Sequence, residues 1–252
     1  MITIAVVNNK GGVGKTTTAY NLAYELKSRG YYVLGIDSDS QGNFSDTWGS
    51  DPDCMGLPDL LTGEAESIGD AIQYGEEGQF DLISGGKLLR ACEASRDFAA
   101  NFKLKKILKD VKDYEFCVID TPPAISTLTI GAMIAADYII ITATPEAFSL
   151  DGLVKLNENI IAVREAGGNA ELMGILLTRY RKNTRLTRDM ADVFRSVAKK
   201  LGTSVFDTVI NESMSIKEAS AARMSCKEYD YKCTGAKDYS DFTDEVEILT
   251  DE

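Results

Sequence analysis

Residues 10–17 combine glycines, lysines and threonines in a pattern suited to phosphate binding. They are Lys10-Gly11-Gly12-Val13-Gly14-Lys15-Thr16-Thr17. Glycines let the backbone turn its N–H groups toward an anion, and a lysine that follows them can reach the β- and γ-phosphates of a nucleotide. The next hydroxyl can bind Mg²⁺. We therefore predict a nucleotide-binding loop over residues 10–17, with Lys15 on the phosphates and Thr16 on the metal.

Two aspartates that follow apolar runs are candidates for the same site. Asp39 lies in Asp37-Ser38-Asp39-Ser40-Gln41-Gly42-Asn43, and Asp120 begins Asp120-Thr121-Pro122-Pro123. Carboxylates at the carboxyl ends of parallel strands lie beside the ligand crevice of an α/β sheet. We expect Asp120 to hold Mg²⁺, directly or through water. The alternatives are an Asx-rich turn for the first segment and a loop-capping aspartate for the second.

The elements that must position these residues alternate along the chain. Apolar runs predict strands over 2–7, 31–37, 79–84, 115–120, 138–143, 172–178 and 205–210. Helical spacing predicts helices over 18–26, 57–61, 68–72, 88–98, 102–111, 149–166, 186–201, 214–224 and 239–249. Repeated strand–helix units imply an α/β fold, a mostly parallel twisted sheet with helices on both faces. We expect residues 1–252 to form a single domain with the nucleotide at the carboxyl ends of the strands.

The composition excludes several classes of protein. The chain has 252 residues, no histidine, five cysteines and a formal net charge of −12. The lack of histidine excludes Ser-His-Asp catalysis and His-ligated metals. The charge argues against a broadly basic nucleic-acid binder. Because no apolar run approaches the roughly 18 residues of a membrane helix, we expect no membrane insertion. An immediate start in a strand, without a signal peptide, predicts a cytoplasmic protein with reduced cysteines.

The second lysine, Lys10, is the signature of a deviant Walker A motif, KGGxGKT. With the segments at 8–21, 35–45 and 115–125, the chain resembles the ParA/MinD family of partition and positioning ATPases, and the likeness extends over nearly the whole sequence. The resemblance implies a P-loop NTPase that binds ATP or ADP with Mg²⁺ and forms a homodimer on ATP binding. It implies that Lys10 reaches the partner subunit's nucleotide and that Asp39, also placed near the metal, orients the attacking water.

The resemblance also implies a biological setting. Slow ATP hydrolysis would be triggered by a ParB-type centromere-binding protein, and the ATPase would act in partition of plasmid or chromosomal DNA, bound nonspecifically on the nucleoid. The loops holding Thr178 and Asn211 are expected to flank the adenine. Three positions depart from the family pattern: Ser40 replaces a proline, Glu212 replaces a basic residue, and Ser215 stands where chromosomal relatives have a DNA-contacting arginine.

A separate basic cluster is the candidate DNA contact. The spacing of Arg181, Arg185 and Arg188 predicts that they share a face at the start of a helix, with Lys182 beside them. Such a face could hold a DNA backbone. The alternative is a solvated face paired with Asp189 and Asp192.

Four other functions remain open. A MinD-like or cargo-positioning ATPase would act on a membrane or protein surface, although the C-terminus is acidic rather than basic and amphipathic. An iron–sulfur reductase would need cysteine ligands, for which Cys92 and Cys117 are poorly placed. A bacterial tyrosine kinase would carry a C-terminal tyrosine cluster, of which Tyr229, Tyr231 and Tyr239 are a sparse version. A module that holds ATP without hydrolysing it would not need the full set of motif residues.

Overall fold

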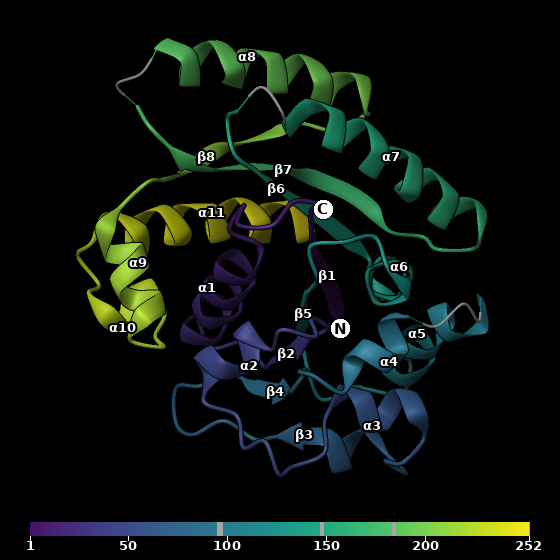
Figure 1. The fold of residues 1–252 in the computed structure, drawn as a ribbon. Helices are drawn as coiled ribbons and strands as arrows, with labels where there is room; N and C mark the ends of the chain where they lie inside the picture. Colours follow the sequence, from purple (N-terminus) through teal and green to yellow (C-terminus); the bar gives the residue numbers. More distant parts are fainter. Residues whose placement is uncertain (95–97, 147–148, 183–184, 252) are drawn as a thin grey trace.

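The computed structural model describes residues 1–94, 98–146, 149–182 and 185–251, and its elements alternate as the sequence predicts (Figure 1). The strands are β1 (Ile2–Val7), β2 (Val33–Asp37), β3 (Ile72–Gln73), β4 (Asp81–Ile83), β5 (Phe116–Asp120), β6 (Tyr138–Ala143), β7 (Glu171–Tyr180) and β8 (Val205–Asn211). The α-helices are α1 (Lys15–Ser28), α2 (Asn43–Trp48), α3 (Leu57–Thr62), α4 (Leu89–Glu93), α5 (Lys103–Leu108), α6 (Thr127–Ala135), α7 (Ser149–Glu165), α8 (Arg185–Lys200), α9 (Met214–Ala221), α10 (Cys226–Tyr229) and α11 (Thr234–Thr250). Two short 3₁₀ helices are η1 (Ile68–Ala71) and η2 (Phe98–Phe102).

The described strands form one sheet in the order β3-β4-β2-β5-β1-β6-β7-β8. β3 runs antiparallel to β4, and the other neighbours pair in parallel. β1 lies near the centre, between β5 and β6. The prediction of a mostly parallel sheet is confirmed, and the sheet brings the ends of β1, β2 and β5 together at one edge.

The register of these three central strands fixes where their carboxylates lie. Asp120 at the end of β5 pairs with Val6 of β1 and with Asp37 of β2. Because side chains alternate between the two faces of a sheet, residues that pair directly point to the same side. Asp37 and Asp120 therefore lie next to each other beside the loop that leaves β1.

Two hydrophobic cores lie on opposite faces of the sheet and confirm the expected layers. One contains buried side chains of α1, α2, α9, α10 and α11, such as Leu22, Phe44 and Phe242. The other contains side chains of α3 to α8, such as Leu104 and Phe194. Figure 1 shows α1, α9, α10 and α11 on one side of the sheet, to the left, and α4, α5 and α6 on the other, to the right. In the described part of the chain, no helix has the length and apolar character that crossing a bilayer requires.

Several elements differ from the sequence predictions. α6 was not predicted because residues 128, 129 and 131–134 are all buried, so it lacks the polar stripe of an amphipathic helix. α2, α10 and β3 also escaped prediction, since each is too short for periodicity to show. α11 begins at Thr234 rather than at 239. The helix expected over 88–98 ends at Glu93, and residues 95–97 of that prediction lie outside the described residues.

Candidate phosphate and metal site

The glycine-rich loop connects β1 to α1 in the conformation that phosphate binding requires. Gly12 and Gly14 have φ of 74° and 79°, a left-handed region that other residues rarely adopt. Gly14 is the N-cap of α1 and provides no side-chain cap. The first N–H groups of this 14-residue helix are therefore available to an anion, which the helix dipole also favours.

Hydrogen bonds to β6 and β7 fix both ends of the loop. The Asn8 side chain donates to the Thr142 carbonyl on β6 and accepts from the Lys10 N–H at 2.9 Å. Thr178 on β7 donates from its hydroxyl to the Val13 carbonyl at 2.9 Å. A Cβ at Gly14 would lie 3.6 Å from Thr178, so the two residues are packed closely. The expected nucleotide residue Thr178 thus lies at the loop, with its hydroxyl already engaged.

Lys15 is buried behind the loop, where it would meet the phosphates. Its side chain is 6% exposed, and Nζ donates to the Lys10 carbonyl at 3.2 Å. Burial lowers the pKa of the ammonium, and the nearby carboxylates of Asp120 and Asp39 oppose this shift. The ammonium therefore belongs to the same electrostatic cluster as the two predicted aspartates.

The Asp120 carboxylate is fully buried, and within the described ranges no donor reaches it in good hydrogen-bond geometry. Neither of its oxygens accepts a hydrogen bond from the described residues. Burial raises its pKa well above the usual range, and Asp37 raises it further, while the nearby Thr16 hydroxyl and Lys15 oppose the shift. A buried carboxylate without a donor is costly unless it is protonated or meets a cation.

Asp37, in contrast, has its hydrogen bonds satisfied inside the protein. Its carboxylate accepts from the Ser45 N–H and hydroxyl, at 2.8 and 2.7 Å, and from the Asp39 N–H at 3.0 Å. Burial still raises its pKa to about 6. These bonds hold the Asp37–Asn43 turn in place, with Asp39 only 5% exposed. Asp37 is therefore a structural member of the cluster, for which the sequence analysis had predicted no role.

The oxygen atoms of this cluster are suitable ligands for Mg²⁺ bound together with phosphate. The Thr16 hydroxyl and the carboxylates of Asp39 and Asp120 could supply oxygen ligands, which Mg²⁺ prefers. Within the described ranges, no set of three acidic or cysteine side chains is arranged to hold a metal alone. Mg²⁺ in proteins typically takes one or two carboxylates, and the rest from phosphates and water. The orphaned Asp120 oxygens are the observation that makes the site suitable.

A cavity beside the loop could hold the base of a nucleotide. It lies between the loop, the end of β7 and the start of α9, and its lining includes Gly14, Thr17, Thr178, Ile210, Asn211 and Tyr239. Asn211 donates from its backbone and side-chain nitrogens to Asp238, each at 2.8 Å. Both expected adenine residues therefore line this cavity, and Asp238 fixes the Asn211 amide.

Two residues near the loop were missed as site residues. Glu146 accepts from the Lys10 ammonium at 2.9 Å, and this bond lowers the pKa of its carboxyl. Arg179 has φ of 50°, which is uncommon for a residue with a side chain, and its guanidinium lies near Gly12. No motif includes Glu146, and Arg179 was expected only in the segment that flanks the adenine and in the basic cluster, not at the phosphate loop. The positive φ of Arg179 leaves no sequence signal, and Glu146 is 136 residues from Lys10.

The basic cluster at 181–188 does not form the single helical face that its spacing predicted. Arg181 follows β7 directly and pairs with Glu212, while α8 begins only at Arg185. Glu212 also lies 3.7 Å from Lys217, and Arg185 lies 3.7 Å from Asp189. The prediction that Arg181 shares a helical face with Arg185 and Arg188 is therefore wrong, because β7 extends to Tyr180. Lys182 and Arg188 are exposed.

Comparisons with known proteins identify a family model and relatives that match this chain. A family model described as an AAA domain matches residues 1–173. The chain is 34% identical over 251 residues to the chromosome partitioning protein ParA of Caulobacter vibrioides, covering 96% of this chain and 92% of the relative. It is 35% identical over 256 residues to the chromosome-partitioning ATPase Soj of Treponema pallidum, covering 97% of this chain and 96% of the relative.

Solved structures share the fold over nearly the whole chain. Apo McdA from Cyanothece has a TM-score of 0.87 and 25% identity, covering 98% of this chain and 99% of that protein. Cobyrinic acid a,c-diamide synthase from Mycobacterium smegmatis, with a bound ATP analogue and magnesium, has a TM-score of 0.84 and 27% identity, covering 100% of this chain and 96% of that protein.

The unpartnered Asp120 carboxylate leads to a stability prediction. Asp120→Asn should raise the free energy of unfolding of the ligand-free protein in a chelator by about 1–3 kcal/mol, since it removes a buried charge with no donor. Urea unfolding measures this change, with Asp110→Asn, at an exposed carboxylate, as the control. Added Mg²⁺ should stabilise the wild type more than Asp120→Asn. A less stable Asp120→Asn variant in chelator would contradict the prediction.

Proposed function

The chain belongs to the ParA/MinD family of partition ATPases, and from this premise we propose that it is an ATP-dependent dimerisation switch that partitions plasmid or chromosomal DNA. One observation carries the proposal. Lys15 is buried behind its own loop, whereas the Lys10 ammonium is exposed and bonded to Glu146 on the loop's outer side. Two lysines of one motif thus point to different places, and only Lys10 is accessible to a second subunit.

The nucleotide would bind with its phosphates on the loop N–H groups and its base in the cavity beside Asn211. Lys15 would leave the Lys10 carbonyl for the β- and γ-phosphates. Mg²⁺, held by Thr16 and Asp120 and through water by Asp39, would neutralise charge that develops on the phosphates. The solved relative with an ATP analogue and magnesium supports this assignment of cofactors.

Hydrolysis would depend on Asp39 and Lys10. Asp39, within the fixed Asp37–Asn43 turn, would orient the attacking water. Lys10 from the partner would stabilise charge on the γ-phosphate, which is the main work of phosphoryl-transfer catalysis. The Asp120–Pro123 segment lies against the loop, because a Cβ at Gly11 would be 3.9 Å from Pro123. Loss of the γ-phosphate can therefore release both the segment and the dimer.

The proposed partners are nonspecific DNA and a ParB-type protein that stimulates a slow intrinsic ATPase. Lys182 and Arg188, both exposed, would contact phosphates. Arg181 and Arg185 carry acidic partners, Glu212 and Asp189. This partial neutralisation favours a second candidate function: a cargo-positioning ATPase that acts on a protein or membrane surface.

Lys10→Ala tests the role of Lys10 across the dimer. The variant should bind ATP within a few-fold of wild type, because Lys15 and the loop N–H groups remain. It should lose ATP-dependent dimers and at least about 100-fold of stimulated hydrolysis, since a charge supplied in trans contributes this much or more in related enzymes. Light scattering with a slowly hydrolysed ATP analogue gives the first readout, with Lys109→Ala as the control. Unchanged dimerisation and stimulated turnover would remove the cross-subunit role.

Glu146→Gln tests whether Glu146 competes with the partner for Lys10. Both side chains are solvated, 43% and 60% exposed, so the pair contributes roughly 0.2–1 kcal/mol. Because a symmetric dimer frees two copies of Lys10, the change should strengthen ATP-dependent dimerisation by about 2- to 30-fold. Sedimentation equilibrium measures this change, with Glu158→Gln, at an exposed carboxylate of α7, as the neutral control. Weaker dimers in Glu146→Gln would mean that Glu146 supports the interface instead.

Binding to nonspecific duplex DNA separates the two candidate functions. We expect binding with the ATP analogue, but not with ADP or without nucleotide, and weaker binding at the higher of two salt concentrations. Replacing Lys182 and Arg188 together with alanine should reduce the slope of log K against log salt by about 2. The control Lys112→Ala, outside the cluster, should leave this slope unchanged. Absence of binding in every state would favour the protein or membrane surface.

A further inference from the structure

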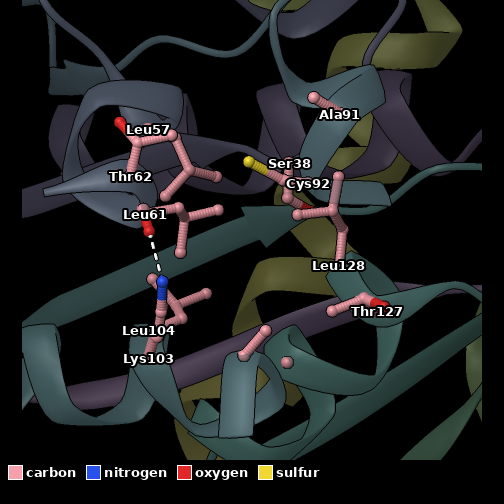
Figure 2. A pocket seen from close by; sticks show the side chains of 12 residues that line it. Ser38, Leu57, Leu61, Thr62, Ala91, Cys92, Lys103, Leu104, Thr127 and Leu128 are labelled. Atoms are coloured by element: carbon pink, nitrogen blue, oxygen red, sulfur yellow. Dashed lines mark hydrogen bonds between the residues drawn. The ribbon is translucent and has the colours of Figure 1, made fainter. Parts of the chain in front are cut away.

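A second cavity lies on the side of the Asp37–Asn43 turn that faces away from the loop. It has a volume of about 320 Å³ and lies among α3, α4, η2, α5 and the start of α6. Figure 2 shows side chains from these elements around it, with Ser38 from the end of β2. Its lining residues are Ser38, Leu57, Leu61, Thr62, Ala91, Cys92, Ala100, Lys103, Leu104, Thr127, Leu128 and Gly131. None of them belongs to the cavity beside Asn211.

The walls are mainly hydrocarbon. Leu57, Leu104 and Leu128 are 1%, 4% and 5% exposed and form much of the surface. The polar atoms of Ser38 and Thr62 are engaged, since Ser38 donates to the Asp120 carbonyl and Thr62 to the Pro58 carbonyl. The interior therefore suits an apolar body, and a cavity of this size and lining is typical of a site for a small molecule.

Among the described residues, Lys103 is the one cation in the lining. Its Nζ donates to the Leu61 carbonyl at 2.7 Å, which holds the ammonium at the cavity wall (Figure 2). Among the described residues this carbonyl is its single hydrogen-bond partner, so two of its three N–H donors are available. The ammonium also lowers the pKa of the Cys92 thiol against the larger effect of burial, so its field reaches the interior. A carboxylate would complement it.

The cavity touches both segments that carry the metal-site aspartates. Ser38 stands between Asp37 and Asp39, and its N–H and hydroxyl donate to the Asp120 carbonyl at 3.0 and 2.6 Å. Thr127 and Leu128 begin the helix that follows the Asp120–Pro123 segment. A molecule in the cavity would therefore contact the back of the metal site without occupying the phosphate site.

We propose that this cavity is a binding site for a small amphipathic acid, with its hydrocarbon chain among the leucines and its carboxylate on Lys103. Bound acid would restrain Ser38 and the start of α6 relative to each other. Binding itself does not rest on the proposed ATPase function. An effect on ATP turnover does rest on it, and the experiment therefore measures binding without nucleotide.

Protection of Cys92 from alkylation tests the proposal with decanoate as the probe. Cys92 lines the cavity, whereas Cys54 is exposed elsewhere and serves as an internal reference. Saturating decanoate should slow modification of Cys92 by N-ethylmaleimide about tenfold, as read by peptide mass spectrometry, and leave Cys54 unchanged. Decanol, which has the same chain but no charge, should require a higher concentration. ATP and ADP should not compete with decanoate.

Two variants identify the parts of the site. Lys103→Gln keeps a donor for the Leu61 carbonyl and should weaken decanoate binding about tenfold, the effect of one charge-assisted hydrogen bond, with decanol unaffected. Lys106→Gln, on the same helix but outside the lining, should bind normally. Ala100→Leu should fill the cavity and abolish protection while thermal unfolding stays cooperative. No protection of Cys92 at millimolar decanoate, or equal protection in Lys103→Gln and wild type, would overturn the proposal.

Discussion

The burial of three carboxylates around one ammonium is the constraint on which the site depends. Asp37 and Asp120 are completely buried, Asp39 nearly so, and the ammonium of Lys15 interacts electrostatically with Asp39 and Asp120. Asp37 is stabilised by Ser45 and the turn backbone, but Asp120 has no such donors. The charge can be balanced only by protons or by a cation from outside. The charge of the buried carboxylates is therefore not balanced until a ligand binds, which suits a protein that responds to nucleotide.

The local parts of this arrangement could be predicted from the sequence. Strand, glycine loop and helix are neighbours in the chain, and their residue types determine a conformation with little help from elsewhere. Asp39 and Asp120 could be predicted because parallel strands end at a common edge. The α/β architecture followed from alternating periodicities, and the sheet order β2-β5-β1 confirms that these motifs converge.

What the sequence did not predict depends on contacts between distant segments. The Lys10–Glu146 pair joins residues 136 apart, and the Thr178–Val13 bond joins residues 165 apart. The Arg181 prediction failed for the same reason, because its spacing from Arg185 assumed one helix, whereas β7 continues to Tyr180 and Glu212 lies across from it. α6 was missed because a helix buried all round has no periodic signal. Side-chain spacing thus predicts chemistry only where the backbone between the residues is also known.

The register between β2, β5 and β1 has a consequence for how this gene can change. Asp120 pairs with Asp37 on one side and Val6 on the other, and side chains alternate faces at each step. Insertion or deletion of a single codon within β5 would turn Asp120 away from Lys15 or separate it from the loop, even if every residue type were kept. Length changes in the exposed segments near 51–55 and 75–79 leave that pairing intact. Natural length variation should therefore collect in those segments and be absent from the three central strands.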